Sequence, residues 1–189
     1  MIPISRLFFK FKVEGLENIP KKTNFIIVSN HVSFLDPLVI MTAVPRKIHC
    51  IALRSLYKIF WIRWFLYMVE ALPSGRISKK AVHMLNRNKN VGLFPEGGLN
   101  REGKLGEFRR GVALLAYKTG RPLVPCACFG TFESLPSGAK FPKLFKPLKV
   151  KIGKPIYILK EFDDVIDTVY LREGVIKVRN SIKEMLDAG

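Results

Sequence analysis

Short apolar runs that alternate with segments of helical periodicity restrict the fold of this chain more than any other feature. Runs of this length, rich in Val, Ile, Leu and Phe and bounded by turn residues, are typical of buried strands. The predicted strands are Phe9–Glu14, Phe25–Ser29, Ile48–Leu53, Val91–Phe94, Leu123–Phe129 and Leu148–Gly153.

The segments between these runs have the periodicity of helices. In the clearest one, side chains recur at spacings of four, three and four from Phe108 to Thr119, and Gly120 follows as a C-terminal stop. The alternation predicts a single-domain α/β sandwich over residues 1–189, with a largely parallel mixed sheet flanked by helices. The predicted helices are Pro37–Ala43, Ser55–Val69, Ser78–Arg87, Phe108–Thr119 and a C-terminal helix over about residues 164–187.

The net charge of +17 is extreme for a chain of 189 residues. Such an excess of Lys and Arg predicts an acidic partner, which is a nucleic acid, an anionic membrane surface, or an acidic carrier with a phosphorylated substrate. A hydrophobic fraction of 48% with fourteen Phe excludes a disordered basic tail.

The aromatic segment Leu56–Val69 has two interpretations. It is shorter than the roughly 18 consecutive apolar residues that a spanning helix needs, and Lys58 and Arg63 interrupt it. It is either a core helix or a helix in the membrane interface, with Trp61 and Trp64 at the level of the lipid headgroups. The charge of the whole chain favours the membrane interface.

Two features indicate the compartment. Cys50, Cys126 and Cys128 lie in apolar runs without the spacing of a metal site, which predicts buried free thiols in a reducing compartment and no bound metal. Met1–Val13 is interrupted by three cations and is not followed by a small-residue cleavage site, so we expect no cleavable signal peptide.

A polar constellation follows the strand Phe25–Ser29, where His31 precedes Asp36 by five residues. A histidine, with an unperturbed pKa of about 6.5, is the natural general base near neutral pH. A carboxylate beside it fixes the tautomer and stabilises the imidazolium. Alternatively, Asp36 caps a helix that begins at Pro37, or Ser33 and Asp36 form a capping box, and His31 is a loop residue. No G-x-S-x-G motif is present, so such a base would activate a hydroxyl of the substrate.

A second constellation follows the strand Val91–Phe94 and contains Glu96, Gly97 and Gly98. The glycines permit a tight turn and leave backbone N–H groups open to an anion or a developing oxyanion. The alternative is an ordinary polar turn. The overlapping G-x-x-x-x-G-K pattern lacks the Ser or Thr of a nucleotide-binding loop, because Leu105 stands there.

Arginines near these constellations are candidates for phosphate binding. Arg76 stands in a turn and is not explained by helix patterning, and Arg101 follows the second constellation, together with Lys104, Arg109 and Arg110. Arginine can donate two parallel hydrogen bonds to a phosphate, although each of these residues taken singly is more typical of a solvated surface. Position favours Arg76 and Arg101 over the others.

The ordered blocks resemble those of the glycerolipid acyltransferases, specifically the 1-acylglycerol-3-phosphate acyltransferase (PlsC-like) family. His31 and Asp36 match the family's H-x4-D block, and the other blocks come in the family's order. These are the leader at 14–20, the second motif from Ala71 to Arg76, the third from Phe94 to Gly97 and the fourth at Val124–Pro125. The resemblance covers about residues 10 to 160.

The resemblance implies the glycerolipid acyltransferase fold and an acyl transfer. His31, oriented by Asp36, would deprotonate a glycerol hydroxyl that attacks the thioester of acyl-CoA or an acyl carrier protein. Arg76 and the third motif (Glu96, Gly97 and Gly98) would hold the phosphate and glycerol of a lysophospholipid acceptor. The acyl donor is a co-substrate, and the mechanism requires neither metal nor other cofactor.

The third motif departs from the family pattern. The family continues with Thr-Arg-Ser where this chain has Gly98, Leu99 and Asn100, so Leu99 replaces the arginine that binds phosphate. Either Arg101 substitutes for it, or the acceptor is a lysolipid without that phosphate. Glycerol 3-phosphate is a further possible acceptor.

We therefore expect a peripheral enzyme on the cytoplasmic face of the cell membrane that makes phosphatidate from lysophosphatidate. The alternative from another class is a basic nucleic-acid-binding module. It is disfavoured because Trp61 and Trp64 lie in an apolar segment and not among basic strand residues. We expect an anionic membrane, and no nucleic acid, as the partner.

Overall fold

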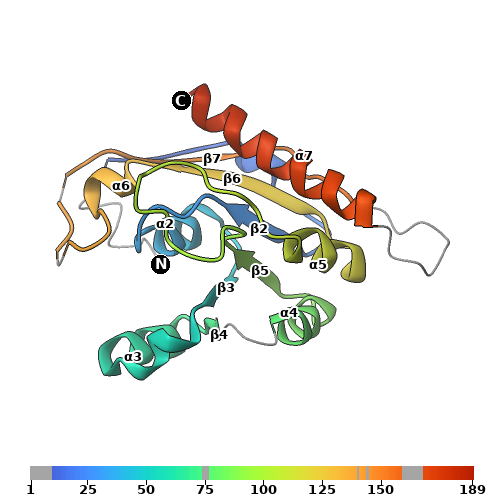
Figure 1. Cartoon of the computed structure of the whole chain (residues 1–189), viewed down its shortest axis with the longest axis horizontal. Coiled ribbons are helices and arrows are strands. Elements are labelled where there is room, and N and C mark those ends of the chain that lie inside the picture. Colours follow the sequence, from blue (N-terminus) through green and yellow to red (C-terminus); the bar gives the residue numbers. More distant parts are fainter. Residues whose placement is uncertain (1–9, 74–76, 140, 144, 159–167) are drawn as a thin grey trace.

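The computed structural model describes residues 10–73, 77–139, 141–143, 145–158 and 168–189. Its centre is one seven-stranded sheet with the strand order β1-β7-β6-β2-β5-β3-β4 (Figure 1). Every neighbouring pair is parallel except β6 and β7, which confirms the predicted largely parallel mixed sheet. The strands are β1 (Phe11–Glu14), β2 (Ile26–Ser29), β3 (Ile48–Ala52), β4 (Leu72–Pro73), β5 (Asn90–Leu93), β6 (Leu123–Phe129) and β7 (Leu148–Ile152).

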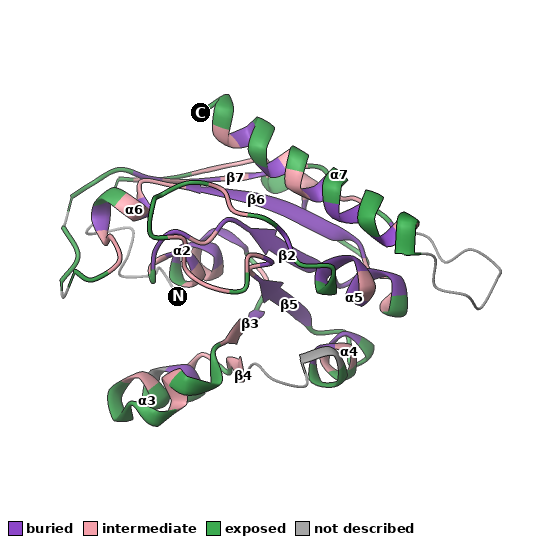
Figure 2. Ribbon diagram, in the orientation of Figure 1, coloured by how far each residue is buried: buried purple, intermediate pink, exposed green. Residues whose placement is uncertain are grey.

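Helices cover both faces of the sheet because the central strands bury side chains on both sides. In β2, Ile26 and Val28 pack into one hydrophobic core, while Ile27 packs into the other. The first core contains residues from α4 (Ile77–Asn86), α5 (Gly111–Thr119) and α7 (Thr168–Asp187). The second contains residues from α2 (Asp36–Ala43). Figure 2 shows the central strands almost wholly buried between these layers. Alternating side chains on a strand point to opposite faces, which explains this division.

Two of the described helices begin three or more residues later than the sequence predicts. The segment predicted as one helix over Ser55–Val69 divides into a 3₁₀ helix, η2 (Arg54–Lys58), and α3 (Phe60–Met68), because Ile59 between them has extended backbone. Helix α5 begins at Gly111 and not at Phe108. Phe108 is buried in the core and the Arg109 N–H donates to the Pro95 carbonyl at 2.9 Å, so this stretch is held against the β5 loop.

Short elements complete the fold. They are the 3₁₀ helix η1 (Leu16–Asn18) and α6 (Thr131–Ser134), neither of which periodicity predicted, and the two-residue strand β4. The predicted start of the C-terminal helix, at residue 164, lies outside the described residues.

Helix α3 lies beside β4 at one edge of the sheet and is set apart from the other helices (Figure 1). Trp61 is 76% exposed and Trp64 is 67% exposed, whereas Leu66 is buried. The core alternative is therefore wrong for both tryptophans. Among the described residues, no helix combines the length and the apolar character that crossing a bilayer requires.

The three cysteines are buried and free, as the apolar runs around them predict. Burial raises the pKa of the Cys50 thiol to about 12 and that of the Cys126 thiol beyond it. Thiols with such pKa values are protonated at neutral pH and are poor nucleophiles.

Candidate active site

The two polar constellations meet at one edge of the sheet. Strands β2 and β5 are parallel neighbours, so the segments that follow their carboxyl ends emerge side by side. Both peptide groups of His31 are bonded to the second constellation. The His31 N–H donates to Glu96 Oε1 at 2.8 Å, and the His31 carbonyl accepts from the Asn100 N–H at 2.8 Å. These contacts join the two segments in one site.

The His31 imidazole is held by a buried carboxylate. Its Nδ1 lies 3.0 Å from Asp36 Oδ2, and the Asp36 side chain is fully buried while that of His31 is 17% exposed. The ring also stacks on Phe94, with centroids 4.1 Å apart and planes inclined by 23°. A carboxylate oxygen accepts hydrogen bonds, so Nδ1 carries the proton and Nε2 presents its lone pair.

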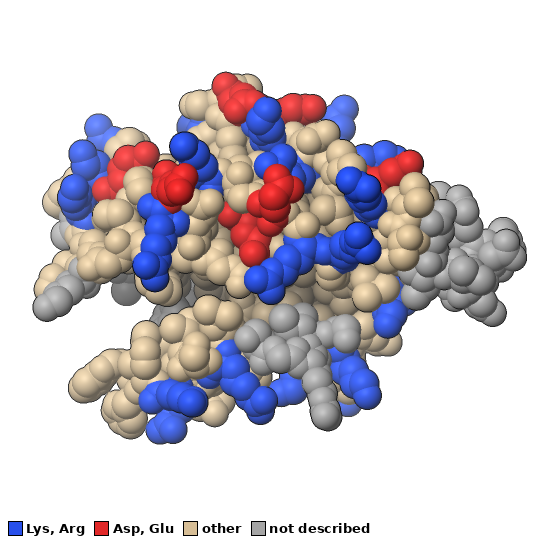
Figure 3. Space-filling model, viewed as in Figure 1, with Lys and Arg blue, Asp and Glu red and all other residues tan. Residues whose placement is uncertain are grey.

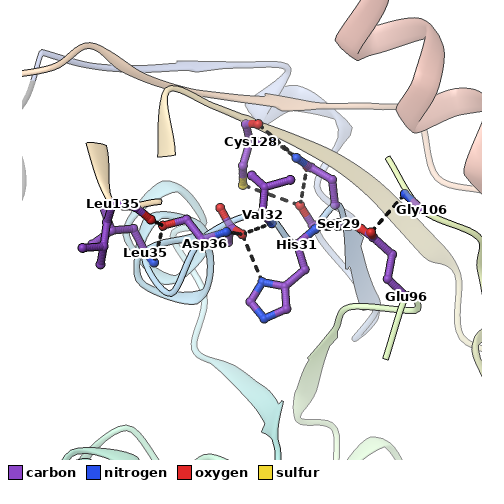
Figure 4. A network of polar contacts seen from close by, with 11 residues as sticks. Ser29, His31, Val32, Leu35, Asp36, Glu96, Gly106, Cys128 and Leu135 are labelled. Carbon is purple, nitrogen blue, oxygen red and sulfur yellow. Dashed lines mark hydrogen bonds and ion pairs between the residues drawn. The ribbon is translucent and has the colours of Figure 1, made fainter. Parts of the chain in front are cut away.

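No group among the described residues bonds to Nε2 of His31. Figure 4 shows the imidazole extending away from the network of polar contacts that holds its other side. A histidine fixed at Nδ1 and open at Nε2 has the geometry of a general base.

The Asp36 carboxylate has a second role at the start of α2. Its Oδ2 also accepts the N–H groups of Val32 and Ser33, each at 2.8 Å. The Ser33 hydroxyl in turn accepts the Leu35 N–H at 3.2 Å and donates to the Leu135 carbonyl at 2.8 Å. Asp36 Oδ2 accepts the Ser33 N–H as in a capping box, but the Ser33 hydroxyl accepts from Leu35 and not from the Asp36 N–H, so the box is not formed. Helix α2 begins at Asp36 after Leu35 and has no side-chain capping bond, so the capping alternatives are wrong. The carboxylate instead fixes the His31 ring and the loop that carries it.

Glu96 joins His31 to a third segment of chain. Its Oε2 accepts the Gly106 N–H at 3.0 Å, while Oε1 accepts the N–H of His31 (Figure 4). Burial raises the pKa of this carboxyl, and the two N–H donors lower it only in part. In this structure the carboxylate bonds to the protein's own backbone and positions His31. Its contact with substrate stays a prediction.

Gly97 and Gly98 border a cavity of about 270 Å³. Gly97 has a φ of 77°, in the left-handed region, and its N–H closes a turn onto the Phe94 carbonyl at 3.1 Å. Around Gly98 nothing lies within 4 Å of the place of a Cβ, so the cavity is open there. The lining residues are Glu96, Gly97, Gly98, Leu99, Asn100, Gly106, Glu107 and Arg109.

The structure describes only one of the two arginines that the sequence predicts as phosphate ligands. Arg101 is exposed on the turn that follows Asn100, and no group of the described chain bonds to its side chain. Arg76 lies outside the described residues. The structure instead adds Arg109 to the cavity, a residue that the sequence marks only as one of several nearby cations. The signal in the sequence was Gly97, a position at which a neighbouring side chain can approach the backbone closely.

Asn30 and Cys128 anchor the histidine loop to the sheet, and sequence patterns did not single out either as part of the site. The Asn30 amide accepts the Cys128 N–H at 2.9 Å and donates to the Cys128 carbonyl at 3.2 Å, which extends the β2–β6 pairing beyond Ser29. Burial raises the pKa of the Cys128 thiol well above its ordinary value. The thiol is thus neutral, and the site offers no cysteine nucleophile.

The family model described as Acyltransferase matches residues 10–129. The 1-acyl-sn-glycerol-3-phosphate acyltransferase of Borreliella burgdorferi is 32% identical over 192 residues, which cover 92% of this chain and 73% of that protein. The 1-acyl-sn-glycerol-3-phosphate acyltransferase of Bacillus subtilis is 32% identical over 155 residues, which cover 77% of this chain and 73% of that protein. The chloroplastic 1-acyl-sn-glycerol-3-phosphate acyltransferase BAT2 of Brassica napus is also 32% identical, and the chain spans only 46% of its length.

Among solved structures, the 1-acyl-sn-glycerophosphate (LPA) acyltransferase PlsC of Thermotoga maritima matches with a TM-score of 0.74 and 30% identity. The match covers 93% of this chain and 72% of that one. These comparisons confirm the fold and the PlsC-like resemblance that the ordered motifs predict. The family model spans more than half of the sequence and includes both His31 and Asp36. The chain therefore belongs to the Acyltransferase family.

Proposed function

We propose that this chain transfers a fatty acyl group from a thioester donor to the free hydroxyl of 1-acylglycerol 3-phosphate, giving phosphatidate. The observation that carries the proposal is the His31 imidazole, bonded at Nδ1 to buried Asp36 and without a partner at Nε2 among the described residues. The names of the bacterial and chloroplast relatives support the same reaction. Either acyl-CoA or an acyl carrier protein supplies the thioester.

The proposed chemistry follows from this geometry. Nε2 of His31 takes the proton of the glycerol hydroxyl as its oxygen attacks the thioester carbonyl carbon. Asp36 stabilises the imidazolium that forms. The tetrahedral intermediate collapses with cleavage of the carbon–sulfur bond, and the imidazolium returns the proton to the departing thiolate. No cysteine or serine of the chain is required, in keeping with the neutral thiol of Cys128.

Leu99 supports a second candidate acceptor, a lysolipid without a phosphate. It removes the arginine that the family pattern places in the third motif, which favours a lysolipid without a phosphate unless other cations compensate. Arg101 is the nearest compensating cation in the sequence, and its guanidinium has no acceptor among the described residues. We propose that Arg101 contributes to binding the acceptor phosphate.

Membrane binding through α3 is part of the proposal. Phe60, Trp61, Trp64 and Tyr67 are each about two-thirds exposed or more. Figure 3 shows Lys and Arg, and no Asp or Glu, on the visible face of the layer formed by α3 and α4. Aromatic side chains beside cations favour the headgroup region of an anionic bilayer, where we place the enzyme as a peripheral protein on the cytoplasmic face.

An acceptor screen tests the proposed reaction. Purified protein is incubated in mixed micelles with labelled palmitoyl-CoA or palmitoyl carrier protein and with lysophosphatidate, glycerol 3-phosphate or a monoacylglycerol. Phosphatidate formed from lysophosphatidate, and abolished by His31→Ala, is the expected result. Preferential acylation of the monoacylglycerol or of glycerol 3-phosphate would reassign the acceptor, and failure with every acceptor and donor would reject acyl transfer.

A further inference from the structure

Arg109 occupies the wall of the cavity beside the third motif. A Cβ placed on Gly97 would lie 2.5 Å from both Cζ and Nε of Arg109, so the guanidinium fills the space that a side chain at position 97 would need. The backbone holds this approach, because the Arg109 N–H donates to the Pro95 carbonyl at 2.9 Å. The Arg109 side chain thus packs directly against the backbone of Gly97.

The guanidinium of Arg109 is the only cation among the residues that line the cavity. Both oxygens of Glu96 accept backbone N–H groups, and Glu107 Oε1 pairs with Nη2 of Arg179 at 3.0 Å. The Arg109 guanidinium has no acceptor within the described chain. In Figure 3 acidic and basic side chains lie side by side at the centre of this face, where Figure 1 shows the chain running from β5 to α5. A site with an unpaired arginine favours an anion.

The cavity is linked to the proposed base through the backbone of His31. Glu96 and Asn100, two of its lining residues, hold the two peptide groups of His31. In 1-acylglycerol 3-phosphate, the free hydroxyl and the phosphate are borne by adjacent carbon atoms. An acceptor whose hydroxyl reaches His31 therefore places its phosphate close by. The N–H groups of Gly98 and Leu99, which have no acceptor within the described chain, are further donors from the same wall.

We propose that Arg109 binds the phosphate of the acceptor in this cavity and compensates for the arginine that Leu99 replaces. The inference rests on the proposed function, because it assigns a residue to the phosphate of that acceptor. It differs from the sequence expectation, which gave the phosphate to Arg76 and Arg101. Gly97 leaves free the space into which the guanidinium extends.

The test compares Arg109→Ala with Arg110→Ala. Arg110 is the neighbouring exposed cation, does not line the cavity and makes no side-chain capping bond to α5, so it controls for loss of charge. Steady-state rates are measured with lysophosphatidate and with a monoacylglycerol acceptor, and thermal unfolding checks the fold of each variant. Loss of a charge-assisted hydrogen bond lowers kcat/KM by about 10- to 100-fold. We expect this loss for Arg109→Ala with lysophosphatidate only, and a smaller loss for Arg109→Lys.

Three results would overturn the assignment of Arg109. The first is a wild-type kcat/KM for lysophosphatidate in folded Arg109→Ala. The second is an equal loss of kcat/KM with both acceptors, and the third is an equal loss in Arg110→Ala. A wild-type protein that does not acylate lysophosphatidate would instead reject the proposed acceptor itself. The two failures are therefore distinguishable in one set of assays.

Discussion

At the scale of single residues, the site is built from side chains that satisfy the backbone around them. Asp36 Oδ2 receives Nδ1 of His31 and the N–H groups of Val32 and Ser33, so it fixes both the ring and the loop that carries it. A buried carboxylate is stable only with such donors. The same contacts that lower the cost of burying Asp36 therefore orient the proposed base, His31.

His31→Ala should abolish most turnover and leave the fold intact. Loss of a general base typically costs about 10²–10⁴-fold in rate, and Asp36→Asn should also be severe because it no longer selects the tautomer with a free Nε2. Phosphatidate formation by each purified variant is the measurement, with circular dichroism to check folding. A folded His31→Ala protein that turns over at the wild-type rate would contradict general-base catalysis by His31.

Glu96 should make stability depend on pH. Burial raises the pKa of its carboxyl above the ordinary value, so the folded protein keeps this proton where the unfolded chain has lost it. The free energy of unfolding then falls as the pH rises from the ordinary carboxyl pKa through the raised one. Glu96→Gln removes the titration, so the wild-type Tm minus the variant Tm should decrease across this window. Thermal unfolding at a series of pH values checks this, and a difference that grows with pH would contradict it.

At the scale of secondary-structure elements, the sheet positions the residues of the candidate site, and α3 exposes its aromatic side chains. The parallel pairing of β2 with β5 brings the loops that follow them to one edge, where His31 and Glu96 meet. Helix α3 is fixed through η2 and β4, with the Tyr57 hydroxyl donating to the Ala71 carbonyl at 2.7 Å. Its tryptophans contribute little to the core and are available for another surface.

Replacing Trp61 and Trp64 by Ser should weaken binding to anionic vesicles without unfolding the protein. Each exposed indole that leaves the interface forfeits apolar burial there. Vesicle sedimentation and thermal unfolding measure the two effects. Ile176→Ser on α7, also an exposed apolar residue, is the matched control. Unchanged vesicle affinity together with a collapsed thermal transition would assign α3 a structural role.

At the scale of the whole molecule, we expect the net charge of +17 to favour association with acidic surfaces. Surface charges act over a Debye length of about 10 Å at 0.1 M salt, so their effect weakens as salt is added. An anionic bilayer can bind both the basic side chains and the exposed aromatic side chains of the protein, whereas an oligonucleotide binds chiefly the basic side chains.

We expect vesicle binding to fall with ionic strength yet to persist at salt concentrations that abolish binding to an oligonucleotide. The exposed aromatic residues of α3 provide the salt-insensitive part. Titration of both ligands over the same salt series is the measurement, with neutral vesicles as the control. Tighter binding to the oligonucleotide throughout would favour the nucleic-acid alternative.

The sequence by itself predicted the largely parallel mixed sheet and the order of the motifs, and it offered the pairing of His31 with Asp36 as one interpretation beside helix capping. Apolar runs of strand length and a spacing of five residues are local properties, and each can be recognised without knowing what packs against it. Even the boundary of α5 was approximate, because the Arg109 N–H is bonded to Pro95, fourteen positions earlier in the chain.

Only the tertiary structure decided the contacts between distant residues. Glu96 reaches the His31 N–H across 65 positions, and Arg109 lies over Gly97 because the chain returns to the third motif after a long loop. The exposure of Trp61 likewise depends on where α3 sits relative to the sheet edge. The type of a side chain determines which groups it can bind. The packing of the whole chain determines which groups lie close enough to bind, and no local sequence pattern specifies those contacts.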